Sequence, residues 1–337
     1  MKTKVCLTID TEHSVGGAWG DPTLRPVPSE RRIFCRIGGR DHGIGWICDE
    51  LAKRNLRATF FSEIFGMLVF GKDDTRRWVQ YLLDRGQDVQ LHTHLNFYYL
   101  ARHLADPGSA GDRTDDLVSL EPRQRAERIE QACELFRSAA GRDPVAYRAG
   151  NWRANRELLA ELANAGIKLD CSFNPAAKNG SFAGEHLQKN RLQRLDGIWE
   201  LPLTVVRQRL PEPHLVERMR PFDLVSLSSW EIRKALDECH RTGASHLAAV
   251  IHSFSCVKTR DVQYLRMKPD RVVQGRLRFF LDYLAANRDR FEVVTCEELV
   301  RTLDDFDQPR GGEVPELGLV HPFARKVVQA VNSIYWV

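Results

Sequence analysis

Three features that would assign a sequence to a class of protein at once are missing from this chain of 337 residues. None of its eight cysteines stands in a CxxC pair, so neither a thiolate zinc site nor covalent haem attachment is indicated. No apolar run approaches ~18 residues, which argues against a membrane-spanning helix. The 49 basic and 45 acidic residues leave a formal charge of +4, and this even balance gives no indication of nucleic-acid binding.

A secretory signal is not apparent either. The chain enters an apolar, strand-like run at residues 4–9, without a basic region, an apolar stretch and a cleavage site before it. Several cysteines lie inside apolar runs, as buried free thiols do. These features predict a protein of a reducing compartment, and we expect a cytoplasmic location.

Apolar patterns typical of strands alternate along the chain with apolar patterns typical of helices. Their alternation without an internal linker predicts one parallel α/β domain over residues 1–306, either a barrel or a doubly wound sheet. The polar segment 101–120 is expected to be a surface excursion. Strands are predicted at 4–9, 56–62, 88–94, 145–149, 167–172, 197–206, 246–253 and 291–295, and helices at 44–55, 75–86, 121–141, 153–166, 228–243, 271–289 and 296–306.

Polar and ionisable side chains follow five of the predicted strands. In both architectures the active site forms at the carboxyl ends of the strands, so these side chains are the candidates for chemistry. They are Asp10, Glu12 and His13 after the first strand, His92, His94 and Asn96 after the third, Arg148, Asn151 and Trp152 after the fourth, Asp170 after the fifth, and His252 after the strand at 246–253.

The pair His92 and His94 indicates a metal site. Residues i and i+2 of an extended backbone point to the same side, so both imidazoles can reach one ion. Two nitrogens and one carboxylate, with an open position for water, form a common catalytic zinc arrangement. The alternative is a hydrogen-bonded core histidine followed by a surface histidine.

Asp10 and Glu12 are also two residues apart. One can bind the metal while the other takes the proton of the bound water, whose pKa a divalent ion lowers to roughly 7. A helix N-cap is the alternative, although the GGAW segment that follows has no helical pattern.

Three further ionisable residues have both a catalytic and a structural interpretation. Arg148 can hold a carboxylate in the site or form a structural salt bridge. His252 can act as a general acid or simply close its strand. Asp170 can orient His252 and raise its pKa, or stand in a turn.

In this order, a series of short segments resembles the motifs of the polysaccharide deacetylase family, which includes chitooligosaccharide and peptidoglycan N-deacetylases. The resemblance spans roughly residues 3–305. The segments are LTIDTE (7–12), LRATFFS (56–62), GQDVQLHTH (86–94), YRAGNW (147–152), LDCSF (169–173), GIWELPLT (197–204) and VIHSFS (250–255).

The resemblance implies a distorted (β/α)7-type barrel that hydrolyses the N-acetyl group of an amino sugar. Carried over by position, Asp10 is the base, Arg148 the group that holds it, His252 the acid that protonates the departing nitrogen, and Asp170 the residue that tunes His252.

The metal ligands depart from the family's common pattern. That pattern has two adjacent acidic residues, whereas Thr11 separates Asp10 from Glu12 here. Its second histidine stands four positions after the first, where this chain has Asn96. The implied ligands are therefore Glu12, His92 and His94, with Asn96 in reserve, and the expected metal is Zn²⁺.

Aromatic side chains beside the motifs can stack on sugar rings or pack in the core. Trp19, Asn151 and Trp152 are the predicted substrate-binding residues. Phe97, Tyr98 and Tyr99 are expected in a loop next to the histidine motif.

Residues 307–337 are predicted to be a linker followed by an amphipathic helix from residue 321. Its apolar stripe comprises Phe323, Val327, Val328, Val331, Ile334 and Tyr335. The helix can pack on the barrel or on a second copy, or it can contact the inner membrane face peripherally.

Taken together, the sequence predicts a metal-dependent carbohydrate N-deacetylase that acts on an acetylated amino-sugar glycan or glycan precursor. Two alternatives stay open: another C–N hydrolase on the same scaffold, and a non-catalytic carbohydrate-binding relative. No nucleic-acid partner is expected, and the oligomeric state is not predicted.

Overall fold

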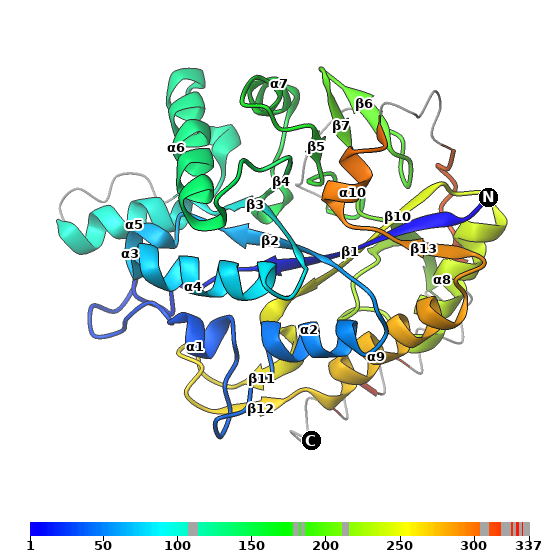
Figure 1. Cartoon of the computed structure of the whole chain (residues 1–337), viewed down its shortest axis with the longest axis horizontal. Coiled ribbons are helices and arrows are strands. Elements are labelled where there is room, and N and C mark those ends of the chain that lie inside the picture. Colours follow the sequence, from blue (N-terminus) through cyan, green and yellow to red (C-terminus); the bar gives the residue numbers. More distant parts are fainter. Residues whose placement is uncertain are drawn as a thin grey trace.

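The computed structural model describes residues 1–106, 114–177, 182, 186–210, 216–303, 310–317, 325, 328–329 and 332. Strand β1 (Thr3–Thr11) runs through the middle of the molecule between β2 and β10, with helices on the outside (Figure 1). Every residue of β1 except Lys4 is buried, which explains its nearly continuous apolar pattern.

The main sheet is almost entirely parallel. Its order is β10-β1-β2-β3-β4-β5-β7-β6, with β13 also paired to β1, and its one antiparallel pair is β6 with β7. The strands are β2 (Thr59–Glu63), β3 (Asp88–Thr93), β4 (Ala146–Ala149), β5 (Leu169–Asp170), β6 (Gln193–Leu195), β7 (Ile198–Glu200), β10 (His246–His252) and β13 (Phe291–Val293).

The chain beyond β7 returns to β10 and closes the curled sheet irregularly. The backbone N–H of Thr204 donates to Ala248 O at 3.1 Å, and that of Leu224 donates to Val250 O at 3.1 Å. Asp223 forms an isolated parallel bridge with Val250. This closure gives a distorted barrel, and the predicted (β/α)7-type fold class is confirmed.

Helices cover the outside of the sheet (Figure 1). Local signals set some of their ends: the Asn155 side chain accepts the N–H of Leu158 at 2.9 Å where α7 begins, and Gly141 ends α6 with a φ of 74°. The helices are α1 (Ser29–Arg32), α2 (Ile44–Ala52), α3 (Met67–Phe70), α4 (Lys72–Leu83), α5 (Leu95–Ala105), α6 (Pro122–Ala140), α7 (Arg156–Asn164), α8 (Ser229–Arg241), α9 (Arg271–Ala286) and α10 (Cys296–Val300).

Helix α5 was not predicted. It contains Phe97, Tyr98 and Tyr99, which were expected in a loop, and it extends into the expected surface excursion at 101–120. The helix begins directly after His94, so no turn residue separates it from the histidine motif. Leu95, Phe97 and Leu100 form its buried face.

The remaining elements are short. β8 (Val205–Leu210), β9 (Val216–Pro221) and β14 (Glu316–Leu317) form a three-stranded sheet, while β11 (Val257–Thr259) pairs with β12 (Met267–Pro269). Single 3₁₀ turns occur at η2 (Leu117–Ser119), η3 (Gly150–Trp152) and η4 (Ser253–Cys256).

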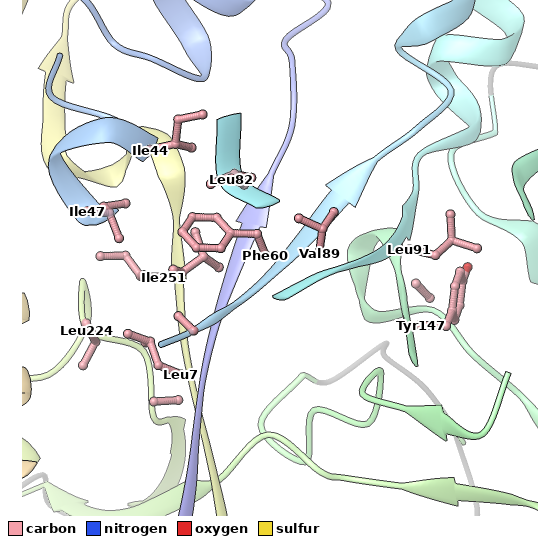
Figure 2. Close-up of a cluster of buried hydrophobic side chains, with 14 of the residues drawn as sticks. Leu7, Ile44, Ile47, Phe60, Leu82, Val89, Leu91, Tyr147, Leu224 and Ile251 are labelled. Atoms are coloured by element: carbon pink, nitrogen blue, oxygen red, sulfur yellow. The ribbon is translucent and has the colours of Figure 1, made fainter. Parts of the chain in front are cut away.

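The core lies between the strands and the surrounding helices. Figure 2 shows Leu7, Phe60 and Val89 of the strands beside Ile47 of α2 and Leu82 of α4, and all five are fully buried. Burying each such side chain contributes about 1.5–3 kcal/mol to folding. This packing holds the strands in register, so the strand ends that carry the polar residues keep fixed positions.

Part of the segment expected as a linker is hydrogen-bonded to the barrel. Ser245 N–H donates to Arg310 O at 3.0 Å, Arg207 N–H donates to Pro315 O at 2.8 Å, and β14 runs parallel to β8.

Of the predicted C-terminal stripe, the structure describes Val328, which is 46% exposed. Phe323, Val327, Val331, Ile334 and Tyr335 lie outside the described residues. Within the described part of the chain, no helix has the length and apolarity to cross a membrane.

Candidate active site

The predicted polar residues meet at the carboxyl edge of the sheet. β1 and β10 are paired so that Asp10 stands opposite His252, and β3 and β4 so that His92 stands opposite Arg148. Glu12 follows β1 by one residue. Parallel pairing therefore brings together side chains that are up to 242 residues apart in sequence.

Glu12, His92 and His94 form a compact cluster. One ligand atom from each lies within 4.8 Å of the others. Oε2 of Glu12 is 2.9 Å from Nε2 of His94 and 3.9 Å from Nε2 of His92. Two imidazole nitrogens and one carboxylate oxygen at this spacing are a donor set that suits zinc, so these three residues can hold one ion.

Both histidines present the same nitrogen to the cluster, because each is held through the other one. Nδ1 of His92 donates to the backbone oxygen of Arg148 at 2.8 Å. Nδ1 of His94 lies 2.8 Å from Oδ2 of Asp115. An outer partner of this kind fixes the ring and leaves Nε2 as the ligand atom.

Glu12 is oriented in the same way. Its Oε1 is 3.3 Å from Nη2 of Arg32, while Oε2 faces the histidines. The Arg32 guanidinium lies over the Phe254 ring at 3.1 Å and donates to the Tyr264 hydroxyl. Each of the three possible ligands therefore has its own partner outside the cluster.

The electrostatic environment acts differently on the three side chains of the cluster. Burial raises the pKa of Glu12, but His94, His252 and Arg32 outweigh it, so the pKa lies below its usual value. Burial and His94 lower the pKa of His92 to about 4, so its ring is neutral at pH 7. For His94, burial is outweighed by Glu12 and Asp115, and its pKa is raised.

Asp10 and Arg148 form an ion pair that is almost completely buried. Nη1 of Arg148 is 2.6 Å from Oδ1 of Asp10, and the two side chains are 1% and 5% exposed. Nη2 donates to the Thr8 hydroxyl at 2.8 Å and Nε to the Cys171 carbonyl at 3.2 Å. Burial alone raises the pKa of Asp10, but Arg148 and the nearby histidines lower it below the usual value.

His252 lies beside this pair and reaches solvent. Its Nε2 is 3.9 Å from Oδ2 of Asp10, and its side chain is 38% exposed. Its ring lies 5.0 Å from that of Phe254. The arrangement places a titratable group at the mouth of the site and a buried, ionised carboxylate behind it.

Asp170 is fully buried at the end of β5. Its described contacts are with Ser172, whose hydroxyl donates to Oδ1 at 2.7 Å, and with Glu200. Burial and the neighbouring Asp170 raise the pKa of Glu200, so this pair holds a proton. Ser172 in turn accepts the N–H of Ala149 at 2.8 Å, which links Asp170 to the strand that carries Arg148.

The structure places two of the predicted substrate-binding residues beside the site. Asn151 and Trp152 have φ angles of 54° and 57° in the turn after β4. The Asn151 amide donates to Asp115 at 2.8 Å, and the Trp152 ring lies 4.8 Å from the Arg148 guanidinium. Trp19 instead packs against His103 of α5, with 5.3 Å between ring centroids.

The role of Asn96 as an alternative metal ligand remains a prediction. Its backbone N–H donates to Asp115 at 3.0 Å. Its side-chain oxygen is buried and has no hydrogen-bond partner among the described residues. His13, the remaining polar residue after β1, stacks on Phe70 at 4.0 Å and bonds Asp74 at 3.3 Å.

Three residues of the site were missed by sequence analysis: Arg32, Glu63 and Asp115. Asp115 lies in the segment predicted to be a surface excursion, and Arg32 is the last residue of α1, a helix that was not predicted. Glu63 follows the last residue of the predicted second strand, so the strand-end rule would have found it. Its carboxyl accepts the N–H groups of Phe65 and Gly66 at 2.8 Å, and burial raises its pKa to about 8.

No protein-family model matches the chain, and no curated protein matches its sequence. Solved structures do match. A structure described as a "putative polysaccharide deacetylase" from Mycobacterium smegmatis aligns over 94% of this chain and 95% of its own, with a TM-score of 0.58 and 17% identity.

Two further structures align less closely. The peptidoglycan deacetylase PdaC from Bacillus subtilis covers 90% of this chain and 94% of its own, with a TM-score of 0.41 and 12% identity. BA3943 from Bacillus anthracis, described as a CE4 family pseudoenzyme, covers 94% and 70%, with a TM-score of 0.43 and 11% identity.

The first of these matches spans nearly the whole of both chains. At this identity the similarity concerns the fold. This chain has the fold of a polysaccharide deacetylase, as the order of its motifs predicts.

Proposed function

We propose that this protein is a metal-dependent hydrolase that removes N-acetyl groups from an amino-sugar-containing glycan or glycan precursor. The observation that carries the proposal is the meeting of two groups of side chains at one strand edge. Glu12, His92 and His94 lie within 4.8 Å of one another, and the buried Asp10–Arg148 pair lies beside them. Each of the three proposed ligands also has a hydrogen-bond partner outside the cluster. Polar residues that met at the strand ends by chance would not be expected to share this feature.

The donor set supports Zn²⁺ as the ion, with Glu12, His92 and His94 as its ligands. The chemistry supplied by such an ion, when bound, is that of a Lewis acid toward the amide carbonyl and water. The residues around the ligands fix their orientation: the Arg148 carbonyl holds His92, Asp115 holds His94, and Arg32 holds Glu12.

Asp10 is the proposed general base. Arg148 keeps it ionised, so the carboxylate is in the form that can accept a proton. In the reaction, the oxygen of water adds to the carbonyl carbon while one proton of that water passes to Asp10.

His252 is the proposed general acid. Its solvent-exposed position suits a group that must be protonated before each turnover. The C–N bond breaks as the nitrogen takes a proton from His252, which releases the free amine and acetate. We assign Asp170 an indirect role: through Ser172 it supports the strand end that positions Arg148.

The substrate is proposed to lie over Trp152 and Asn151, because both stand at the turn that follows Arg148. Trp19 stays a proposed contact for a longer glycan.

The direct test is release of acetate from acetylated chitooligosaccharides and from peptidoglycan fragments, together with elemental analysis of the purified protein. We expect one divalent ion per chain, loss of activity with a chelator and recovery with Zn²⁺. Glu12→Gln should lose both metal and activity, whereas Glu30→Gln, at an exposed ion pair with Arg36, should lose neither. Amide cleavage that persists without any bound ion would instead identify another C–N hydrolase.

The non-catalytic alternative gives a different result. Binding of the acetylated oligosaccharide by the metal-loaded protein, with no acetate released from any substrate, would mean that the chain is a carbohydrate-binding relative.

A further inference from the structure

A cavity lies away from the strand-end site, between α8, α9 and the described C-terminal residues. It measures about 580 Å³, and three arginines line it: Arg271, Arg276 and Arg325. Among the described residues, no carboxylate lines this cavity. We call it the arginine pocket.

Two of these arginines are buried as part of the fold. Arg276 is 5% exposed and Arg325 is 1% exposed. Long cationic side chains are rarely buried to this extent unless an anion accompanies them. Arg271, at the first position of α9, is exposed. The pocket thus combines two buried arginines with one exposed arginine at its rim.

The described carboxylates near this cluster offset part of its positive charge. Glu231 pairs with Arg325 at 2.7 Å and its other oxygen is bound by Ser228. Arg276 donates to the Val225 carbonyl, and among the described side chains no carboxylate lies within 4.0 Å of its guanidinium. Burial lowers the pKa of Arg276, and Arg325 lowers it further. Asp270, Glu231 and Asp223 raise it, but the net shift is downward.

The start of α8 adds to the positive potential. Ser228 and Ser229, the cap and first residue of this 13-residue helix, line the pocket. The first turn of a helix presents backbone N–H groups and the positive end of the helix dipole, which favour an anion.

A neighbouring cavity of about 400 Å³ extends the basic surface. It shares Arg276 and Val272 with the arginine pocket and is also lined by Lys258 and Arg260, with Asp270 as its acidic residue. The Asp270 carboxylate caps α9 by accepting the N–H groups of Val272 and Val273 at 3.0 Å. The same carboxylate raises the pKa of Arg276, so it offsets part of the positive charge on this side of the pocket.

The rim of the arginine pocket is apolar. Trp230 is 67% exposed and Val328 is 46% exposed, and Phe279 lies half-buried between them and the arginines. An anion that carries an apolar or ring-bearing portion would cover these side chains while its charge meets the guanidinium groups. An inorganic counter-ion alone would leave them in water.

We propose that the arginine pocket binds a phosphate group. Several guanidinium groups that converge on one cavity match the several acceptor oxygens and the double charge of a phosphate better than a single carboxylate. This site is separate from the strand-end residues and does not depend on the function proposed for them. The phosphate can come from a phospholipid headgroup or from a soluble phosphorylated molecule.

Calorimetric titration of the full chain with inorganic phosphate tests the pocket itself. We expect binding that Arg271→Gln and Arg276→Gln each weaken at least ten-fold. The matched control is Arg278→Gln on the same helix, because Arg278 pairs with Glu50 instead of lining the pocket. If the buried Arg276 variant does not fold, the exposed Arg271 variant still decides the result.

Sedimentation with vesicles separates the two sources. Phosphatidylcholine vesicles with and without phosphatidylglycerol are used with wild type, Trp230→Ala and Arg271→Gln. Association that needs phosphatidylglycerol and is lost in both variants identifies a lipid headgroup. Phosphate binding in solution without vesicle association identifies a soluble ligand. Absence of both, or equal loss in the Arg278 control, overturns the proposal.

Discussion

Arg148 and Asp10 form a buried ion pair across the barrel, with 2.6 Å between Nη1 and Oδ1, although they are 138 residues apart in sequence. The same guanidinium also binds Thr8 and the backbone of Cys171. The Arg148 side chain therefore connects β1, β4 and the residue after β5, and it keeps the Asp10 carboxylate ionised.

Replacing Asp10 by asparagine tests this pair. Asp10→Asn keeps the shape of the side chain but removes the proposed base, so acetate release should fall by about 10²–10⁴-fold. The substitution also leaves the charge of Arg148 buried without its counter-ion, which should destabilise the fold by about 3–5 kcal/mol at most. Metal content should stay at the wild-type level. An active variant would show that another group takes the proton.

Asp115→Asn should weaken metal binding. The Asp115 carboxylate holds Nδ1 of His94 at 2.8 Å and adds negative charge behind the ligand. Loss of such a partner typically costs 10–100-fold in metal affinity. Competition with a chromophoric zinc chelator measures the constant.

The neighbouring residue provides the matched control for that experiment. Asp116 caps the turn η2 by accepting the N–H of Ser119 and makes no described contact with His94. Asp116→Asn should keep wild-type affinity, and an equal loss in both variants would point to a general effect of the loop.

His246 should make stability depend on pH. It is 3% exposed at the start of β10, where burial and the facing Lys4 lower its pKa to about 4 from the usual 6.5. Between pH 6.5 and 4 the unfolded chain binds a proton that the native protein excludes, so the free energy of unfolding falls as the pH falls. The loss approaches about 3 kcal/mol at pH 4.

Urea unfolding at several pH values checks this dependence. His246→Gln should remove that part of the slope between pH 6.5 and 4 and leave the slope above pH 7 unchanged. The difference between the two proteins isolates His246 from the other groups that titrate in this range. Parallel curves for both proteins would contradict the assignment.

Phe60→Ala should destabilise the barrel strongly. The Phe60 side chain is fully buried on β2 among Leu82, Val89 and other residues of the cluster in Figure 2. Truncation removes its contacts and leaves a cavity, at a cost of about 3–5 kcal/mol. Phe60→Leu should lose much less, because most of the volume is kept. Denaturant unfolding measures both, and a small loss for the alanine variant would mean that neighbours collapse into the space.

Much of the fold was predictable because its signals are local. Apolar periodicity depends on neighbouring residues, so β1, β3, β10 and helices such as α6 were found within a few residues of their observed ends. The strand predicted at 197–206 is instead divided between β7 and β8. Helix α5 was missed because nothing in its sequence marks the boundary with the histidine motif.

The site was partly predictable for a related reason. Once the strands were predicted to be parallel, residues such as Asp10, His92 and His252 had to end at one edge, wherever they stood in the sequence. The same rule cannot find groups that lie away from the strand ends. Asp115 and Arg32 reach His94 and Glu12 from segments whose course depends on how they pack against the barrel.

By itself, the sequence determined the order of the main strands and helices, the burial of the strands and most of the polar strand ends, because short-range periodicity encodes all three. Tertiary structure alone decided which partners these polar groups have: that Asp170 meets Glu200, that Arg32 holds Glu12, and that Arg276 and Arg325 share one pocket. The physical reason is that a hydrogen bond or ion pair needs atoms within a few ångström, and for residues far apart in sequence only the packed chain sets that distance.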